Sequence, residues 1–262
     1  MAATAVITGG SSGIGQSCAR LFCEKGYTVY ELSRSGKSEG GIRHITADIT
    51  KPHEVAAAFE AIFAAQGRID LLVNNAGMGI SGAIEFTELD AAKRIFDVNF
   101  FGMFTCCKAA LPYLRQSEGG RIINLSSVAA PISIPFQAFY SATKAAVNSF
   151  TMALANEVRP FGIRVSALMP GDVHTGFTSA REKSEIGSQL YGQAIERAVS
   201  SMEKDELGGM SPELVAGLIF KISQCRHPKV LYTAGGKYRL FVIIAKLLPA
   251  TVCNRLVGKI YG

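Results

Sequence analysis

Several classes of protein are excluded by patterns that this 262-residue sequence lacks. Its six cysteines include no C-x-x-C pair and share no metal-ligand spacing with the four histidines. They therefore indicate reduced, mostly structural thiols in a cytoplasmic compartment, and no metal site. No apolar run approaches the roughly 18 residues that a transmembrane helix needs. The first apolar strand starts near Ala5, so we expect no signal peptide.

Acidic residues are missing from the C-terminal part of the chain. No Asp or Glu follows Glu213, whereas eight Lys and Arg residues do. The formal net charge of +6 therefore arises in this segment, and the rest of the chain is weakly acidic. A basic surface confined to one end argues against a nucleic-acid-binding protein.

Short apolar runs alternate with longer segments of helical apolar spacing, without a low-complexity linker or an internal repeat. Strands are expected at Thr4–Thr8, Thr28–Leu32, Ile42–Thr46, Leu71–Val73, Arg121–Leu125, Arg164–Leu168 and Val230–Tyr232. Helices are expected at Gly15–Lys25, Glu54–Gln66, Ala91–Leu114, Tyr140–Val158 and Pro212–Ser223. This alternation predicts an α/β fold: a Rossmann-like, doubly wound, seven-stranded parallel sheet flanked by helices. In such sheets ligands bind beyond the carboxyl ends of the strands.

Residues 1–236 should form this single domain. Within it, residues 175–210 are the least regular part and are rich in Ser, Gly and charge. They predict a substrate loop or lid, with a solvated insertion as the alternative. Residues 237–262 predict a basic, amphipathic helical extension of the same domain. The extension either covers the substrate cleft or a subunit edge, or lies on an anionic membrane surface.

A glycine-rich stretch, Thr8–Gly15, joins the first strand to the first helix. Gly9, Gly13 and Gly15 permit a tight turn and let a phosphate approach the backbone. The helix that follows offers free N–H groups and the positive end of its dipole. The stretch therefore predicts a site for the pyrophosphate of a dinucleotide, and its spacing is G-x-x-x-G-x-G rather than G-x-G-x-x-G.

Tyr140 and Lys144 are four residues apart, which places them on one face of the expected helix. A phenol with an unperturbed pKa near ~10 is a poor acid–base catalyst at neutral pH, but an adjacent ammonium lowers that pKa. The spacing therefore indicates a proton-transfer pair. Taken alone, it also fits two unrelated residues on a solvated helix.

The sequence resembles the short-chain dehydrogenase/reductase superfamily up to about residue 235. Six motifs of the superfamily occur in order. They are Thr8–Gly15, Asn74-Asn75-Ala76-Gly77 after the fourth strand, Asn99 in a helix, Ser126-Ser127 after the fifth strand, Tyr140–Lys144, and Pro170–Thr175.

The resemblance implies a catalytic set of Asn99, Ser127, Tyr140 and Lys144. Tyr140 would exchange a proton with the substrate oxygen, which Ser127 would hold and stabilise. Ser127 is preferred to Ser126 because it lies 13 residues before Tyr140. Lys144 would lower the Tyr140 pKa and bind the nicotinamide ribose, while the cofactor supplies the hydride. Asn99 would fix a helix bend and a water that relays protons to Lys144; a purely helix-bending role is the alternative.

The resemblance also implies a set of cofactor contacts. They are Gly9, Ser11, Ser12, Gly13, Ile14, Gly15, Ser33, Arg34, Asp48, Ile49, Asn75, Ala76, Gly77, Tyr140, Lys144, Pro170, Gly171, Val173 and Thr175.

The end of the second strand bears on the choice of cofactor. NAD-preferring relatives usually carry an acidic residue there, which binds the ribose 2′-OH. This sequence has Ser33 and Arg34, which can hold a 2′-phosphate. We therefore expect NADP(H) to be favoured over NAD(H), although Glu31 shares the strand face of Ser33. Asp48 should contact the adenine or cap the next helix.

The segments expected near the cleft, above all residues 128–139, are apolar and predict a hydrophobic substrate such as a steroid, a retinoid or another lipid. With the helical tail, they resemble hydroxysteroid-dehydrogenase-like members. We therefore expect an NADP(H)-dependent oxidoreductase that interconverts a ketone and a secondary alcohol, most simply a hydroxysteroid dehydrogenase. The alternatives are a reductase of 3-oxoacyl thioesters, retinoids or other lipid carbonyls, and an NADP-binding regulatory protein with an idle site. We expect a cytoplasmic homodimer or homotetramer, and its basic C-terminus is a candidate for peripheral membrane contact if it does not cover the cleft or a subunit edge.

Overall fold

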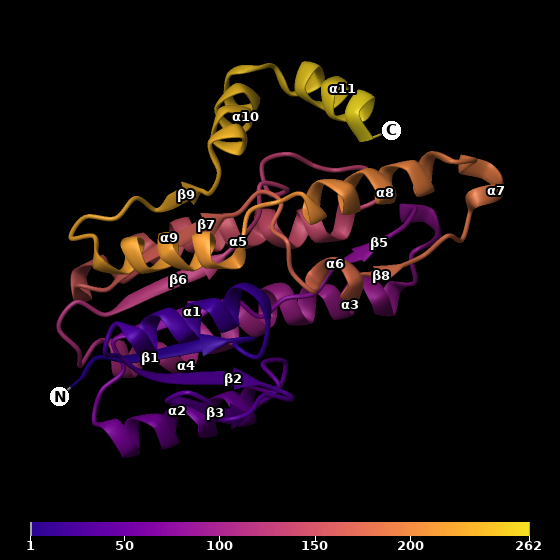
Figure 1. Cartoon of the computed structure of the whole chain (residues 1–262). Coiled ribbons are helices and arrows are strands. Elements are labelled where there is room, and N and C mark those ends of the chain that lie inside the picture. The colour runs from indigo at the N-terminus through magenta and orange to yellow at the C-terminus, as the bar shows by residue number, and fades with distance from the viewer. Residues whose placement is uncertain (1, 262) are drawn as a thin grey trace.

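A seven-stranded parallel sheet forms the centre of the computed structural model, which describes residues 2–261 (Figure 1). The strands lie in the order β3-β2-β1-β4-β6-β7-β9. Their bounds are β1 (Thr4–Thr8), β2 (Thr28–Ser33), β3 (Ile42–Thr46), β4 (Leu71–Asn74), β6 (Arg121–Leu125), β7 (Arg164–Met169) and β9 (Leu231–Thr233). The predicted fold is confirmed, because each of the seven predicted runs forms one strand of this sheet.

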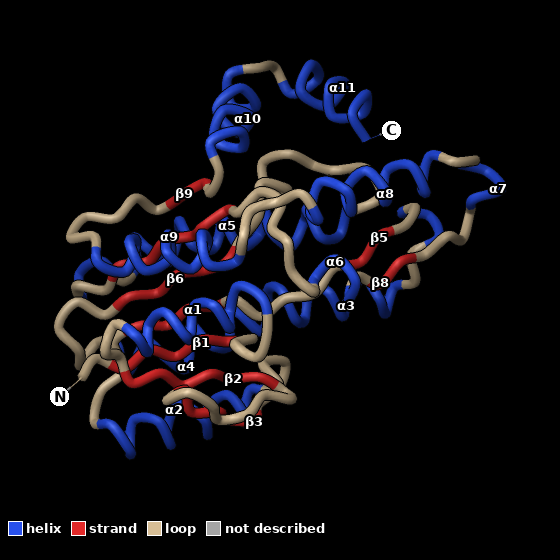
Figure 2. The backbone as a smooth tube through the Cα atoms, in the orientation of Figure 1, coloured by secondary structure: helices blue, strands red, loops and turns tan. Residues whose placement is uncertain are grey.

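Helices cover both faces of the sheet, and the strand residues alternate between the two layers. Val6 and Leu72 belong to the core under one layer of helices. Ile7 and Val73 belong to the core under the other layer. Figure 2 shows the strands, in red, among the helices, in blue. The helices of the first core are α2 (Pro52–Gln66), α4 (Met103–Leu114) and α5 (Ala138–Glu157), and those of the second are α1 (Gly13–Glu24) and α9 (Pro212–Gln224).

The order of the strands reverses at β1. From this strand the chain winds through β2 to β3 on one side, and through β4, β6 and β7 to β9 on the other. β1 pairs in parallel with both β2 and β4, so the loops after β1 and β4 leave the same edge of the sheet and diverge. This is the position at which doubly wound sheets bind their ligands.

The segment predicted to be helical, Ala91–Leu114, is helical but is divided around Asn99, where the resemblance implied a bend. α3 (Leu89–Phe96) continues into a π-helical segment, η2 (Asp97–Gly102), before α4 begins. Asn99 of this segment makes two hydrogen bonds to the backbone of Met78: its Oδ1 accepts from the N–H (2.8 Å) and its Nδ2 donates to the carbonyl (2.9 Å). These tertiary bonds compensate for the irregular turn, and π-helical turns are frequent at functional sites.

Residues 175–210 are more regular than their composition suggests. They contain α6 (Phe177–Ala180), β8 (Glu182–Lys183), α7 (Ser188–Tyr191) and α8 (Ala194–Leu207). β8 pairs with β5 (Ile80–Ser81) in a separate two-stranded sheet, and Ile195 and Met202 of α8 are buried. This packing argues against a wholly solvated insertion. A lid movement of the segment stays a prediction.

Two helices, α10 (Gly236–Leu247) and α11 (Ala250–Tyr261), follow β9 and project beyond the sheet, in yellow in Figure 1. Val242 and Val257 are buried, whereas several large apolar side chains of both helices are exposed. Across residues 2–261, every helix falls short of the length or hydropathy required to cross a bilayer. Two 3-10 turns, η1 (Ile84–Phe86) and η3 (Arg159–Phe161), complete the described elements.

Candidate active site

The loop between β1 and α1 is built for close approach of a ligand to its backbone. Gly9 and Gly13 have φ values of +65° and +53°, in the left-handed region that favours glycine. A Cβ on Gly15 would lie 2.2 Å from the Gly9 carbonyl oxygen, so only glycine fits there. Within the described part of the chain, no side chain caps α1 from Ser12. The first N–H groups of α1 are therefore available to a phosphate.

Asn75 braces this loop from the neighbouring strand. Its Nδ2 donates to the carbonyl oxygens of Thr8 and Gly9 at 3.1 and 3.0 Å. The backbone N–H groups of Asn75 and Ala76 both donate to Thr8 Oγ1 at 3.1 Å. The loops after β1 and β4 are thereby fixed to each other, and the Asn75 side chain has a structural role whether or not it touches a cofactor.

A cavity of about 700 Å³ is lined by both this loop and the catalytic candidates. Gly15 and Asn99 lie outside its lining: Gly15 packs beneath the loop and Asn99 behind Gly77. The glycine-lined end fits a pyrophosphate and the volume fits a dinucleotide with a substrate. All other residues predicted from the sequence line it: Gly9, Ser11, Ser12, Gly13, Ile14, Ser33, Arg34, Asp48, Ile49, Asn75, Ala76, Gly77, Ser127, Tyr140, Lys144, Pro170, Gly171, Val173 and Thr175.

Tyr140 lies in the first turn of α5, beside Ser127. Burial raises the pKa of the phenol to about 12, while the hydrogen-bonding Ser127 hydroxyl and the charge of Arg181 act in the opposite direction. Ser127 Oγ accepts a hydrogen bond from the Ala129 N–H at 3.1 Å, so its hydroxyl proton can be donated to the Tyr140 oxygen or, in its place, to a substrate oxygen. The phenol is protonated at neutral pH and is suited to donate a proton to a carbonyl oxygen.

The lowering of the Tyr140 pKa by Lys144 stays a prediction, because burial dominates the pKa of both groups in the protein alone. The Lys144 Nζ lies 5.7 Å from the centroid of the Tyr140 ring and donates to the Leu125 carbonyl at 2.9 Å. Burial lowers the pKa of the Lys144 ammonium to about 8. Desolvation disfavours the charged form of each group and therefore outweighs the attraction that spacing alone suggested.

Asn99 connects the loop after β4 to α5. It is 2% exposed, and in addition to its bonds to Met78 its Nδ2 donates to Thr143 Oγ1 at 3.2 Å. A Cβ on Gly77 would lie 3.2 Å from Asn99 Oδ1 and 3.7 Å from Lys144 Nζ, so these two groups approach the same stretch of backbone. The helix-bending role of Asn99 accords with this geometry, and the proton relay stays a prediction.

The far end of the cavity is formed after β2 and β3, where Arg34 and Asp48 both line it. Burial opposes ionisation of Asp48, but the hydrogen bonds from Thr50 and the charge of Arg34 hold the pKa of this carboxyl below its usual value. The Thr50 N–H and hydroxyl donate to Asp48 Oδ1 at 2.9 and 2.8 Å. Because the N-cap of α2 is Lys51, the Asp48 carboxylate stabilises the preceding turn rather than the helix itself.

Two carboxylates that sequence reasoning did not select border the catalytic end. Asp172 and Glu206 line the cavity, and their negative charges raise the pKa of Tyr140. Glu206 lies on α8, where it is paired with the buried Arg181. Asp172 lies within the Pro170–Thr175 motif and could have been considered from it. Glu206 comes near Tyr140 only through folding.

The C-terminal helices also reach this end of the cavity. The hydroxyl of Tyr238, on α10, donates to Asp172, and a Cβ on Gly171 would lie 2.1 Å from the Tyr238 ring. Tyr261, on α11, lines the cavity itself. The arrangement favours the alternative in which the C-terminal helices cover the substrate cleft, and it explains why Gly171 carries no side chain.

The site can bind a dinucleotide and exchange a proton with a substrate oxygen. When bound, a nicotinamide donates or accepts a hydride. Ser127 and Tyr140 both offer protons at the catalytic end, where developing negative charge on oxygen would be stabilised. Among residues 2–261, no three His, Cys, Asp or Glu side chains are grouped as metal ligands.

Residues 3–186 match the short chain dehydrogenase family. The sequence is 42% identical over 226 residues to the 3-ketodihydrosphingosine reductase of Bacteroides thetaiotaomicron, covering 85% of this chain and 84% of the relative. The structure is similar to a short-chain dehydrogenase from Streptomyces avermitilis, with a TM-score of 0.85, 27% identity and coverage of 98% of this chain and 96% of the other.

Two further similar structures hold different cofactors. ElxO with NADP bound has a TM-score of 0.76 and 26% identity, covering 92% of this chain and 100% of the other. The 3-ketoacyl-(acyl-carrier-protein) reductase of Brucella melitensis, complexed with NADH, has a TM-score of 0.75 and 27% identity, covering 90% of this chain and 98% of the other. The fold is therefore compatible with either nicotinamide cofactor.

Proposed function

The chain belongs to the short-chain dehydrogenase/reductase family of oxidoreductases that act on carbonyl and alcohol groups, and from that premise we propose that it reduces the ketone of a long-chain lipid with NADPH. The substrate class that the site supports best is a 3-keto sphingoid base, in which an amine lies next to the ketone. The proposal rests on one observation: carboxylates and apolar side chains line the catalytic end of a single cavity.

Asp172 in this lining favours a cationic substrate, because Glu206 is already paired with Arg181 whereas Asp172 accepts a hydrogen bond from the neutral Tyr238 hydroxyl. Asp172 and Glu206 share the cavity with Tyr140 and lie close enough to affect its pKa by their charge. An ammonium next to the ketone would be attracted to such a site, whereas the anionic carrier of an acyl thioester would be repelled. Steroids and retinoids carry no cationic group that a carboxylate would attract. The amino ketone is therefore favoured over the steroid that the sequence suggested.

An alkyl chain has apolar surface available beside the same carboxylates. The cavity lining includes Met78, Ile134 and Met202, and Phe177 lies with its ring centroid 5.8 Å from that of Tyr140. These side chains would bury the methylenes next to the ketone at about 0.8 kcal/mol each. The name of the Bacteroides relative, which is 42% identical, is consistent with such a lipid.

NADP(H) remains the proposed cofactor, in preference to NAD(H). The supporting residues are Ser33 and Arg34, which line the cavity at the end of β2, where a hydroxyl and a guanidinium can bind a 2′-phosphate. At the end of β2, where an acidic side chain would bind the ribose 2′-OH of NAD(H), this chain has Ser33 and therefore no carboxylate.

Peripheral contact with a membrane would give the enzyme access to its lipid. On α10, Leu240, Ile243 and Leu247 are 56%, 54% and 79% exposed, and Ile260 on α11 is 62% exposed. These apolar side chains occur among basic residues and without any acidic residue, because none follows Glu213. An anionic bilayer surface complements both features. The proposed location is therefore cytoplasmic, with α10 and α11 on the membrane.

A homodimer or homotetramer is the proposed assembly. Phe101 and Phe104, near the start of α4, and Met152 on α5 are exposed to 51%, 40% and 44%. Exposed aromatic side chains on adjacent helices are typical of an interface. Light scattering on the purified protein would measure the assembly directly, and a monomer at micromolar concentration would contradict it.

The central experiment is a substrate screen that follows NADPH absorbance. The compounds are 3-ketodihydrosphingosine, its analogue without the amine, a 3-ketosteroid, retinal and a 3-oxoacyl thioester. The expected result is the highest kcat/KM with the amino ketone, and a lower kcat/KM when NADH replaces NADPH. A steroid or thioester turned over faster would overturn the substrate class. Absence of turnover with all five, despite tight NADPH binding, would favour the regulatory protein with an idle site.

A further inference from the structure

A buried ionisable pair lies behind the end of β2, outside the motifs and the catalytic residues. Glu31 is 2% exposed, and its partner in the pairing of β2 with β3 is His44. His44 Nδ1 makes a short contact with Glu31 Oε1, which also accepts a hydrogen bond from Ser33 Oγ at 3.2 Å. Glu31 Oε2 is buried, and none of the described residues hydrogen-bonds it. His44 is therefore the one basic group in contact with this carboxylate among residues 2–261.

The backbone closes tightly over the pair. A Cβ on Gly36 would lie 1.7 Å from Glu31 Oε1 and 2.5 Å from His44 Nδ1. A Cβ on Gly10 would lie 2.6 Å from Glu31 Cβ. His44 Nε2 lies 2.9 Å from Thr46 Oγ1, so both ring nitrogens have an oxygen partner and the ring orientation is fixed. Gly10 and Gly36, in the loops after β1 and β2, thus hold the Glu31 carboxylate in place and also line a cavity beside it.

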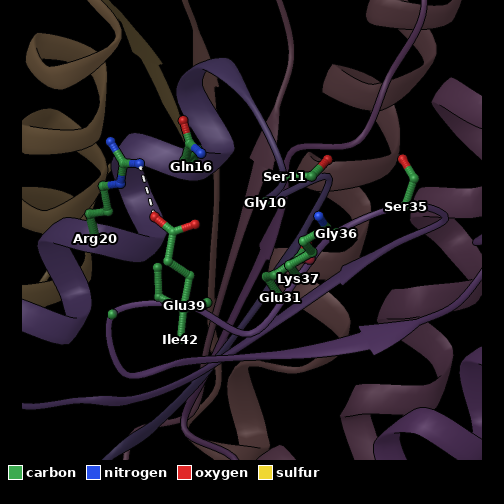
Figure 3. A pocket seen from close by; sticks show the side chains of 11 residues that line it. Gly10, Ser11, Gln16, Arg20, Glu31, Ser35, Gly36, Lys37, Glu39 and Ile42 are labelled. Carbon is green, nitrogen blue, oxygen red and sulfur yellow. Dashed lines mark ion pairs between the residues drawn. The ribbon is translucent and has the colours of Figure 1, made fainter.

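A second cavity, of about 260 Å³, is lined by Glu31 of this pair (Figure 3). Figure 3 shows Glu31 close to Gly36 and Lys37, with Ser11 and Ser35 nearby. Ser11 and Ser35 line this cavity and the large one, so the two cavities adjoin next to Ser33 and Arg34. Two hydroxyls and the Lys37 ammonium suit an anion there, and the Glu39 carboxylate of the lining is paired with Arg20 at 3.7 Å. An unpaired Glu31 carboxylate would repel the anion.

We propose that His44 determines cofactor specificity through Glu31. As the ion-pair partner of the carboxylate it offsets the negative charge, so that the junction of the two cavities, beside Arg34, accepts the 2′-phosphate of NADP(H). This inference rests on the proposed preference for NADP(H). Without His44, Glu31 would keep an uncompensated negative charge beside the phosphate and weaken its binding by roughly tenfold at the effective dielectric of a partly buried site. The neutral 2′-OH of NAD(H) would feel no such repulsion.

The test compares adenosine 2′,5′-bisphosphate with AMP, because the two ligands differ only in the 2′-phosphate. Calorimetry on the full chain would give both affinities for the wild type, His44→Gln, Glu31→Gln and the double variant. We expect His44→Gln to lose roughly tenfold for the bisphosphate while AMP changes by less than about twofold. Glu31→Gln, alone or in the double variant, should bind the bisphosphate at least as well as the wild type, because the repelling charge is gone.

His53→Gln is the matched control, since this histidine also stands beside a glutamate, Glu54, but its side chain is 81% exposed. It should leave both affinities unchanged. Thermal unfolding of each variant identifies any that fail to fold, and the double variant, which can keep an amide–amide hydrogen bond, then carries the comparison.

The outcomes distinguish failure of the NADP(H) preference from failure of the role of His44 and Glu31. A wild type that binds AMP as tightly as the bisphosphate overturns the proposed NADP(H) preference. A wild type that prefers the bisphosphate, with His44→Gln unchanged or weakened equally for both ligands, overturns the role of the pair alone.

Discussion

The Lys144 ammonium lies 5.7 Å from the centroid of the Tyr140 ring, yet its hydrogen bond goes to the Leu125 carbonyl at 2.9 Å. Lys144 is buried and Tyr140 is partly buried, and desolvation shifts both toward their neutral forms: the pKa of Tyr140 rises to about 12 and that of Lys144 falls to about 8. A protonated phenol is the form needed to reduce a ketone, so the protein alone is poised for reduction at neutral pH.

Tyr140→Phe should abolish turnover while leaving cofactor binding intact. The substitution removes the proton donor and keeps the ring beside Phe177. We therefore expect kcat to fall by about 10²-fold to 10⁴-fold. Fluorescence titration with NADPH should give a Kd close to that of the wild type. Turnover within a few-fold of the wild type would contradict the assignment of the acid.

Lys144→Met should stabilise the protein at pH 7 although it inactivates the enzyme. The pKa of Lys144 is lowered from 10.5 to about 8 by burial, so between these values the unfolded chain binds more protons and stability rises with pH. Below about pH 8 the folded state carries the full cost of a buried ammonium, on the order of 3 kcal/mol, part of which the Leu125 hydrogen bond offsets.

Urea unfolding of the cofactor-free protein at pH 7 and pH 10 would measure this effect. The advantage of Lys144→Met should shrink at pH 10, where the wild-type amine is neutral in the folded state. Lys108→Met, at an exposed position of α4, is the control and should change stability little at either pH. A variant less stable than the wild type at pH 7 would show that desolvation of Lys144 is small.

Gly15→Ala should disrupt the phosphate-binding loop. The added Cβ would lie 2.2 Å from the Gly9 carbonyl oxygen and 2.4 Å from Asn75 Nδ2, so the brace between the two loops would break. We expect NADPH affinity to fall by at least about tenfold and the protein to lose about 1–3 kcal/mol of stability. Gly217→Ala, in α9 with open space around its Cβ, is the matched control and should gain up to about 1 kcal/mol.

Asp172→Asn should raise KM for an amino ketone more than for a ketone without an amine. The amide is nearly isosteric and can still accept the Tyr238 hydrogen bond, but it removes a negative charge from the cavity. A roughly tenfold loss in kcat/KM for the amino ketone is expected, because one charge contact of about 1–1.5 kcal/mol disappears. Equal effects on both ketones would indicate a structural role for Asp172 and no recognition of the amine.

Ile243→Ser combined with Leu247→Ser should release the protein from anionic vesicles. Both side chains are more than half exposed on α10, and their burial in the bilayer contributes about 1.5–3 kcal/mol each. Sedimentation with phosphatidylserine vesicles at low salt would measure binding. Leu190→Ser, at a 75% exposed position of α7, is the control and should bind as the wild type does. A wild type that stays in the supernatant would contradict the membrane proposal.

Much of the fold follows from local sequence. The strands are predictable because β-branched apolar runs such as Thr4–Thr8 are buried on both faces of a parallel sheet, which leaves a continuous signal. Apolar spacing does not predict the division of the helix around Asn99, which only the family resemblance indicated, because the division depends on hydrogen bonds to Met78 at a sequence separation of 21 residues. The regular packing of residues 175–210 was missed for a related reason: the two-residue strand β8 exists only through its pairing with β5.

The sequence by itself determined the family, the sheet and many of the residues that line the large cavity, because spacing after each strand places them at one edge. Only the tertiary structure decided the charge states of Tyr140 and Lys144, since desolvation depends on everything packed around them. It also brought Glu206 and Tyr261 to the catalytic end and His44 to Glu31. These contacts join segments far apart in the chain or on neighbouring strands, and no local pattern records them.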